Sequence, residues 1–352
     1  MFIGRAFGHS SYAIFYKTGH IAANYGRLLS KHMHSSKPSI EIVTPAPLGS
    51  LHGNRITALR WQGFLKSLGY QSRLTQSWSR KNTDLLIALH AYRSHSSILK
   101  FKQQFPDKPV ILVMTGTDIY RDMASHDEVQ QSMRLASHIV VLQSASLDQI
   151  PKEFLTKTRV IYQSTKGVAR KTSPKRNFLI SLIGHLRPEK DPFCLARALP
   201  FLPASSTVKI KHLGKAMSPE MRTLAKQYSA HLARYQWLDE QTHAKTMQVL
   251  SRSHLMVITS LMEGGAHVVT EAIAIGVPVI ASNISGNRGL LGDDYPGYYP
   301  VGDEKTLAAL MLQAETNPAF YKSLEKSVRQ RRKLVQPEFE KRSIKKLLGQ
   351  CL

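Results

Sequence analysis

A junction between residues 255 and 276 constrains this chain more than any other stretch. It reads LMVITSLMEGGAHVVTEAIAIG. Its first part is an apolar, β-branched run of strand length, and after Glu263 and two glycines the apolar residues return at helical spacing. The pattern predicts a buried strand, a glycine turn and a helix whose first N–H groups have no partners within the helix. Such N–H groups at the edge of a sheet bind anions such as phosphate.

Two carboxylates frame this glycine turn. Glu263 stands immediately before the glycines, and Glu271 lies on the predicted helix, with seven residues between them. Carboxylates accept hydrogen bonds from sugar hydroxyls, whereas free backbone N–H groups bind phosphate. The junction therefore suits a ligand that combines sugar hydroxyls with phosphate. The alternative is two solvated glutamates around a glycine-rich turn that binds nothing.

The charge of the chain points to anionic partners. Its 352 residues contain 48 Lys and Arg against 24 Asp and Glu, which gives a net charge of +24. Nucleic acid, an anionic membrane surface and phosphorylated small molecules all fit such a balance. We expect no nucleic acid, because the chain has no zinc-finger spacing, aromatic RNA-binding signature or heptad zipper. A membrane contact through the basic residues after 328 stays open but is not favoured over a solvated helix face.

Other counts bear on compartment and cofactors. No apolar run reaches the roughly 20 residues that span a bilayer, and Cys194 and Cys351 lie too far apart for a disulfide framework or a metal site. We therefore expect a soluble, cytoplasmic protein. There is no Asp-x-Asp pair to hold a metal ion, so we expect no metal and no cofactor. Residues 1–36 carry no acidic side chain and no clean periodicity, which predicts a disordered extension or an upstream start-site choice.

From residue 37 onward, strands alternate with helical connections, which is typical of doubly wound parallel sheets. The pattern predicts a first Rossmann-like domain over residues 37–164, a basic linker over 165–177 and a second domain over 178–335, with helix over 305–335. Residues 336–352 are predicted to form a C-terminal helix. The strands are predicted at 39–43, 84–90, 109–114, 138–142, 159–164, 178–183, 208–214, 235–238, 255 onward and 277–282.

Polar residues of the first domain gather just past the ends of predicted strands, where open α/β sheets bind ligands. For any one of them a satisfied loop residue is the alternative, but their shared location predicts a site. The group comprises His90, Arg93, Thr115, Asp118 and Arg121. The loop after the first strand contains Gly49 and Gly53, followed by Arg55, and its glycines are not spaced as in a dinucleotide fingerprint.

The second domain opens with a strand that runs into Gly184, Arg187 and Lys190. Arg can bind a diphosphate through two parallel hydrogen bonds, and Lys acts as a point charge. The pair could thus stabilise a diphosphate leaving group without a metal ion. An exposed loop pair is the alternative.

These two motifs together resemble the sugar-nucleotide half of the retaining GT-B glycosyltransferases. The resemblance implies an α/β GT-B fold, in which two Rossmann-like domains face each other across a cleft. It also implies that the C-terminal helix over residues 336–352 can cross back to the first domain. It implies that Glu263 contacts the donor sugar, that Glu271 holds the ribose hydroxyls, and that Arg187 and Lys190 neutralise the diphosphate. The other residues expected at the donor are Gly264, Gly265, Ala266, His267, Gly184, Gly49 and Gly53.

Six stretches resemble, more narrowly, the selenosugar synthase family of selenoneine biosynthesis; they are residues 44–61, 88–94, 115–122, 184–193, 262–269 and 294–303. The resemblance covers about residues 37–350. It implies transfer of a hexose, typically N-acetylglucosamine, from its UDP conjugate to selenophosphate. His267 is a departure, since Asn is as common there, and it bears on sugar selectivity.

This resemblance also suggests roles for the first domain. Some of Arg55, Arg60, Arg93 and Arg121, with Thr115 and Asp118, are expected to seat selenophosphate, and His90 to hydrogen-bond the donor sugar. Two other functions stay open. One is a conventional glycosyltransferase acting on a lipid or polysaccharide at the membrane, and the other is a polyanion-binding protein without catalytic activity.

Overall fold

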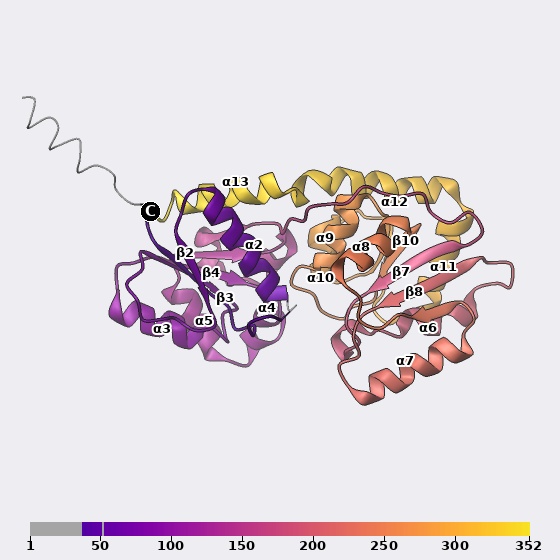
Figure 1. The fold of residues 1–352 in the computed structure, drawn as a ribbon, viewed down its shortest axis with the longest axis horizontal. Coiled ribbons are helices and arrows are strands. Elements are labelled where there is room, and N and C mark those ends of the chain that lie inside the picture. Colours follow the sequence, from indigo (N-terminus) through magenta and orange to yellow (C-terminus); the bar gives the residue numbers. More distant parts are fainter. Residues whose placement is uncertain (1–36, 51–52) are drawn as a thin grey trace, which may run out of the picture. The chain divides into compact units, whose positions relative to one another are not determined.

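The computed structural model describes residues 37–50 and 53–352. The predicted extension over residues 1–36 lies outside the described residues. The chain divides into a unit of residues 1–38 and a unit of residues 39–352, and the fold below is that of the second unit. The predicted α/β fold is confirmed: this unit contains two six-stranded sheets with helices on their faces (Figure 1).

The first sheet has the strand order β2-β1-β3-β4-β5-β6, and all neighbouring strands are parallel. Its central strands are entirely buried and, apart from Glu41, apolar, as expected for a parallel sheet covered on both faces. The strands are β1 Ile40–Val43, β2 Ser72–Thr75, β3 Leu85–Leu89, β4 Val110–Met114, β5 His138–Val141 and β6 Thr158–Val160.

Two predictions for the first sheet need correction. The strand predicted at residues 159–164 is β6, which starts earlier and ends at Val160, because the chain then leaves the sheet toward the second domain. The edge strand β2 was not predicted, since its sequence SRLT is short, polar and only half-buried.

The helices of this domain surround the sheet. On α2 the buried residues Thr57, Ala58, Trp61 and Leu65 recur at helical spacing and pack on one face of the sheet. The α-helices are α2 Gly53–Ser67, α3 His95–Gln104, α4 Thr117–Tyr120 and α5 Asp127–Leu135, and the 3₁₀ turns are η1 Asp122–Ala124, η2 Ser144–Gln149 and η3 Lys152–Lys157.

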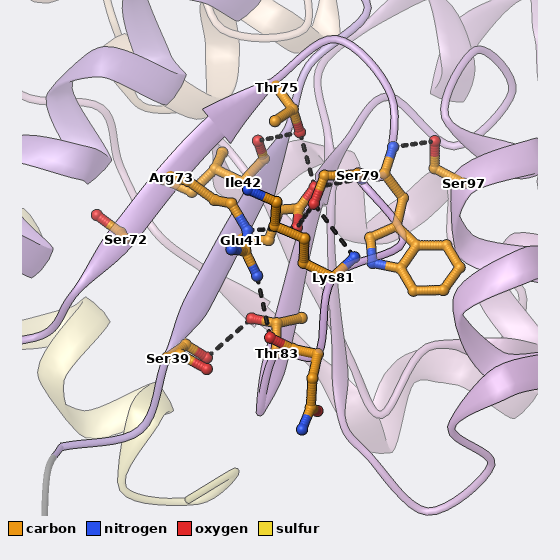
Figure 2. Close-up of polar contacts among 12 residues, drawn as sticks. Ser39, Glu41, Ile42, Ser72, Arg73, Thr75, Ser79, Lys81, Thr83 and Ser97 are labelled. Atoms are coloured by element: carbon orange, nitrogen blue, oxygen red, sulfur yellow. Dashed lines mark hydrogen bonds and ion pairs between the residues drawn. The ribbon is translucent and has the colours of Figure 1, made fainter.

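A buried carboxylate fixes the edge of the first sheet (Figure 2). Glu41 on β1 is fully buried and accepts hydrogen bonds from Arg73 Nε at 2.7 Å and Thr75 Oγ1 at 3.0 Å on β2. It also accepts from the backbone N–H and the hydroxyl of Ser79, both at 2.7 Å. All its bonding capacity is used within the domain, so Glu41 holds β2 and the following loop and is not a ligand group.

The second sheet has the order β12-β11-β10-β7-β8-β9 and is also parallel throughout. The strands are β7 Phe178–Ile183, β8 Val208–Leu213, β9 Tyr235–Trp237, β10 Leu255–Ile258, β11 Val279–Ser282 and β12 Tyr298–Tyr299. The direction in which successive strands are added changes between the central neighbours β7 and β10. Strands β8 and β9 lie beyond β7, whereas β11 and β12 lie beyond β10 on the opposite side. Ligands of open α/β sheets bind where neighbouring connections diverge in this way.

Helices cover the second sheet as well. The buried apolar residues of α9 pack in the core of this domain, and the helix ends at Gly276, whose φ of +86° suits glycine. The predicted helix over 305–335 is two helices, because Asn317 caps a new helix that starts at Pro318. The helices are α6 Cys194–Ala198, α7 Pro219–His231, α8 His243–Arg252, α9 His267–Ile275, α10 Ser285–Leu291, α11 Glu304–Thr316 and α12 Pro318–Arg331, with turns η4 Pro188–Lys190, η5 Leu199–Phe201 and η6 Arg332–Val335.

Two segments join the domains. Residues 161–177 form neither helix nor strand, and the later part of this segment packs along the second domain, where the Lys171 N–H donates to Ser251 O at 2.9 Å. The last helix, α13 Pro337–Leu348, contributes Ile344, Leu347 and Leu348 to the core of the first domain. In Figure 1 it lies beside α2, whereas α12 lies over the second domain.

Candidate active site

The loops after β7 and β10 meet at the switch point of the second sheet. Thr259 Oγ1 donates to the Lys190 carbonyl at 2.8 Å, and the Leu261 N–H donates to the Glu189 carbonyl at 2.9 Å. A small pocket opens between these loops, and its lining includes Gly184, Lys190, His212, Thr259 and Ser260. Because these loops follow adjacent parallel strands, residues 75 positions apart in sequence form one polar surface.

A charge pair occupies this surface. Lys190 Nζ forms an ion pair with Glu263 Oε1, and Ser260 Oγ donates to the same carboxylate oxygen at 2.6 Å. Both charged side chains are largely buried. Partial burial strengthens the attraction but removes both groups from water, so each needs its partner. Arg187, by contrast, is exposed just before η4. The structure therefore brings Lys190 and Glu263 together and places Arg187 nearby on the loop surface.

The helix after the glycine turn begins at His267, with Ala266 as its N-cap residue. Glu271 on this helix is 5% exposed and accepts from His243 Nε2 at 2.8 Å. The Nε2 atom of His267 lies 3.6 Å from the same carboxylate oxygen, and its Nδ1 is buried without a hydrogen-bond partner among the described residues. The predicted second carboxylate thus has a histidine partner from α8 that the sequence pattern did not indicate.

Burial and neighbouring charge move the pKa values of these histidines in opposite directions. The hydrogen bond to Glu271 raises the pKa of His243 above its ordinary value. Burial lowers the pKa of His267, against the opposing charge of Glu271. At neutral pH His267 is therefore an uncharged side chain at the start of α9.

The glycine turn touches the first domain. A Cβ atom on Gly264 would lie 2.3 Å from the Thr115 carbonyl oxygen and 2.3 Å from Gly116 Cα, so a side chain at this position requires the backbone to move. A Cβ atom on Gly265 would lie 3.0 Å from Leu142 Cβ. Both glycines are therefore positions of close approach between the domains, in addition to any contact with a donor.

Asp118 has a structural role that differs from its predicted contact with the acceptor. Its carboxylate is fully buried and accepts from the backbone N–H groups of Ala91 at 2.9 Å, Thr115 at 2.9 Å and Gly116 at 2.7 Å. These bonds join the loops after β3 and β4. With its oxygens occupied by backbone donors, Asp118 shapes this edge of the sheet instead of reaching a ligand.

His90 follows β3 in the left-handed backbone region, with φ of +76°. It is 2% exposed, its Nε2 lies 2.9 Å from Thr117 Oγ1, and its Nδ1 accepts from the Arg93 N–H at 3.3 Å. Burial lowers its pKa, although the nearby Asp118 and Asp122 act in the opposite direction. Both ring nitrogens are engaged within the first domain, so the predicted bond to a donor sugar requires the Thr117 contact to change.

Two arginines of the first domain expose their side chains at this edge. Arg93 is exposed after β3, and Arg121 is half-exposed, with Nε 2.9 Å from Asp122 Oδ1. The hydrogen bond to Asp122 raises the pKa of Arg121, and the charge of Glu189 in the second domain contributes a smaller effect. Thr115 is half-buried between β4 and α4. Arg93 and Arg121 are therefore the predicted acceptor residues that remain accessible.

The loop after β1 is described in part, since Leu51 and His52 lie outside the described residues. Gly49 has φ of +77°, and Gly53 is the first residue of α2. Arg55 is half-buried, and its Nη1 has no hydrogen-bond partner among the described residues.

Arg60 was expected among the cations that seat an anion, and the structure corrects this. Its Nε donates to Glu340 of α13 at 2.8 Å, and its side chain is mostly buried. The fully buried Glu340 also accepts from Trp61 Nε1 at 2.8 Å and from the Ser164 N–H at 2.7 Å. Arg60 is thus neutralised by a residue 280 positions away and anchors the C-terminal helix.

Residues 37–50 and 53–352 contain no group of three or more His, Cys, Asp or Glu side chains that could hold a metal ion. Within the same ranges, no helix combines the length and the apolar character needed to cross a membrane.

The two parallel α/β sheets, whose carboxyl-terminal loops contact each other, have the GT-B fold, and solved structures share it. HepE of Anabaena in complex with UDP superposes with a TM-score of 0.70 at 16% identity, over 89% of this chain and 100% of that one. Sucrose-phosphate synthase of Thermosynechococcus elongatus gives 0.71 at 16% identity, over 89% and 99%. The pneumococcal O-GlcNAc transferase GtfA in complex with UDP and GlcNAc gives 0.58 at 16% identity, over 84% and 60%.

A family match covers the second domain. Residues 163–331 match the family model described as glycosyl transferases group 1. The segment contains the loops after β7 and β10 and the whole of α9. A comparison with curated proteins found no match.

Proposed function

We propose that this chain is a glycosyltransferase that uses a UDP-sugar as its donor. The observation that carries the proposal is the meeting of Lys190 and Glu263 at the switch point of the second sheet, next to a pocket that Gly184 also lines. The match of residues 163–331 to glycosyl transferases group 1 supports it. So do the neighbours in complex with UDP and with UDP and GlcNAc.

Each residue at this edge has a role in donor binding. The diphosphate binds Lys190 and the exposed Arg187, and the N–H groups at the start of α9 face its oxygens. Lys190 leaves Glu263 for the diphosphate, which frees the Glu263 carboxylate to accept hydrogen bonds from sugar hydroxyls. Glu271 accepts from the ribose hydroxyls. As the bond from the anomeric carbon to the diphosphate breaks, these cations stabilise the negative charge on departing UDP.

The acceptor in this proposal is selenophosphate, and the enzyme is a selenosugar synthase of selenoneine biosynthesis. Selenium attacks the anomeric carbon, a C–Se bond forms, and the C–O bond to UDP breaks, with its electron pair leaving on UDP. Arg93 and Arg121 are accessible cations suited to the phosphate oxygens of the acceptor. Because selenium is already an anionic nucleophile, positioning and charge stabilisation account for most of the rate. The sugar is N-acetylglucosamine.

One observation favours a second candidate, a conventional glycosyltransferase that acts on a lipid or polysaccharide at a membrane. The last helices expose a row of cations that an anionic surface would attract. They are Lys322, Lys326, Arg329, Arg332, Lys333, Arg342, Lys345 and Lys346. This candidate keeps the same donor site and differs only in the acceptor.

The deciding experiment measures UDP release from UDP-N-acetylglucosamine with and without selenophosphate. We expect release that depends on selenophosphate, with a KM for selenophosphate about tenfold higher in Arg121→Ala, since one charge-assisted contact is lost. The KM for the UDP-sugar should stay within a factor of about two. Release that is independent of selenophosphate but stimulated by anionic vesicles would favour the second candidate. Salt-sensitive nucleic-acid binding without any UDP binding would contradict both.

A further inference from the structure

The short helix α10 contacts both Glu263 and the first domain. Its residues Gly286 and Gly289 lie three positions apart and therefore share one face. Both are buried, as is Asn287 between them. Each glycine leaves room for a group from another element, and Asn287 starts a chain of hydrogen bonds, so three structural contacts meet at α10.

The first contact is with the backbone of Glu263. A Cβ atom on Gly286 would lie 2.1 Å from the Glu263 carbonyl oxygen and 2.7 Å from Glu263 Cβ. No side chain fits at such distances, so α10 packs directly against the residue that bears the site carboxylate. A shift of α10 therefore shifts Glu263.

The second contact is a chain of hydrogen bonds that ends on the Glu263 carboxylate. Asn287 Nδ2 donates to the carbonyl and the hydroxyl of Ser282, at 2.9 and 3.2 Å. Ser282 Oγ donates to the Ser260 carbonyl at 2.6 Å, and Ser260 Oγ donates to Glu263 Oε1 at 2.6 Å. Asn287, Ser282 and Ser260 are almost completely buried, so water does not compete for these bonds.

The third contact comes from the first domain. A Cβ atom on Gly289 would lie 1.6 Å from Gln143 Oε1 and 2.4 Å from Gln143 Cδ, so the Gln143 side chain fills the space that this glycine leaves. Gln143 is fully buried, and its Nε2 donates to Tyr120 at 2.8 Å and Ser146 at 2.6 Å. These bonds fix its rotamer, so Gln143 is a rigid projection of the first domain seated on α10.

We propose that Gln143 and Asn287 are positioning residues for Glu263. The contact of Gln143 with Gly289 fixes the position of α10. Helix α10 in turn fixes the position of Glu263, through the packing of Gly286 and through the hydrogen bonds of Asn287, Ser282 and Ser260. Contact between the domains thereby sets the orientation of the carboxylate that meets the donor sugar. This inference rests on the proposed function of the same site and adds the element that links domain contact to it.

A double-mutant cycle tests the contact between Gln143 and Gly289. Gly289→Ala places a methyl group where the Gln143 amide lies, and we expect kcat for selenophosphate-dependent UDP release to fall tenfold to about a hundredfold, with UDP affinity unchanged. In a Gln143→Gly background, the same Gly289→Ala change should have no further effect on kcat, because the obstructing atoms are gone. Arg288→Ala, an exposed position on the same helix, is the control. An unchanged kcat in Gly289→Ala, or an equal loss in both backgrounds, would overturn the inference.

Ser282→Ala provides a test that does not depend on packing. It removes one hydroxyl from the chain, and we expect kcat to fall about three- to tenfold while the melting temperature and UDP affinity stay close to those of the wild type. A wild-type kcat would overturn the role of the chain. Failure of the proposed function gives a different result, since the wild-type protein itself would then release no UDP with selenophosphate.

Discussion

The two loop edges that meet in this molecule use their polar residues differently. At the second-domain edge, Lys190 and Glu263 are paired with each other across two loops, and Lys190 also lines a pocket. At the first-domain edge, Asp118 is saturated by backbone N–H groups, and His90 contacts Thr117. One edge keeps its charges available to a ligand, while the other uses its buried polar groups to build the loops themselves.

This difference shows how much the position of a residue just after a strand reveals about its function. Residues at that position lie at the edge where ligands bind, yet the same position is where loops need partners for their own backbone N–H groups. A buried carboxylate next to three such donors is a loop residue. An exposed guanidinium on the same edge, as in Arg93, is accessible to a ligand. The burial of a side chain and its hydrogen-bond partners distinguish a structural loop residue from a ligand-binding one, whereas its position in the sequence does not.

The largest expected effect tests the second-domain edge. Lys190→Met keeps the length of the side chain but removes its charge, so departing UDP loses a stabilising cation and Glu263 loses its partner. We expect kcat/KM for UDP release to fall at least about a hundredfold, which corresponds to roughly 3 kcal/mol in the transition state. Steady-state kinetics with UDP-N-acetylglucosamine measure this change.

Lys226→Met is the matched control, because Lys226 is an exposed lysine on α7, in the same domain. It should retain wild-type kinetics. If Lys190→Met kept kcat/KM within about threefold of the wild type, the assignment of Lys190 to the diphosphate would be wrong and the contrast between the two edges would lose its main support.

The next effect tests the first-domain edge and concerns stability. Asp118→Asn replaces one carboxylate oxygen with an NH₂ group, so at least one of the buried backbone donors faces another donor. We expect the free energy of unfolding to fall by about 2–4 kcal/mol, as measured by urea denaturation. Asp293→Asn is the control, since Asp293 is exposed and its carboxylate forms an ion pair with Arg288. Equal stability of Asp118→Asn and the wild type would show that Asp118 is not a structural residue.

Much of the fold was predictable because its signals are local. The apolar strand runs and the glycine turn before α9 each act over a few residues, whereas the cap at Asn317, which divides the predicted helix over 305–335, was missed. β2 was missed because Ser72–Thr75 is a polar edge strand whose only sequence signal is weak. The strand at β6 was predicted too long because Ile161 is buried and apolar like a strand residue, although the pairing with β5 ends at Val160.

The part of the candidate site that could be predicted from the sequence is the part whose residues lie close together around the glycine turn. The spacing of Glu263 and Glu271 placed both at the junction, and the structure puts Lys190 beside the first. The sequence could not show that His243 bonds Glu271, that Glu340 neutralises Arg60, or that Gln143 meets Gly289. These contacts join residues 28 to 280 positions apart, and only the fold determines them.

The smallest effect refines the comparison at Glu271, the buried carboxylate of the second edge. Its hydrogen bond raises the pKa of His243. The pair therefore makes its full contribution to the stability of the free protein at pH values below the ordinary histidine pKa of about 6.5. This contribution is lost as the pH rises through the raised pKa. Ribose hydroxyls that donate to Glu271 would compete with the His243 N–H. Donor binding should then lower the pKa of His243 and release protons, which means that donor affinity increases with pH.

UDP-N-acetylglucosamine is the suitable ligand for this measurement, because its diphosphate has no proton to lose near neutral pH. We expect its affinity in calorimetric titrations to rise about two- to fivefold between pH 6 and pH 8. In His243→Gln this rise should disappear, whereas it should persist in the control His231→Gln, at the last residue of α7. If the wild type and His243→Gln showed the same pH dependence, Glu271 would bind the ribose without displacing His243 or would not bind it at all. The carboxylate of the second edge would then resemble Asp118 of the first, fully engaged within the protein.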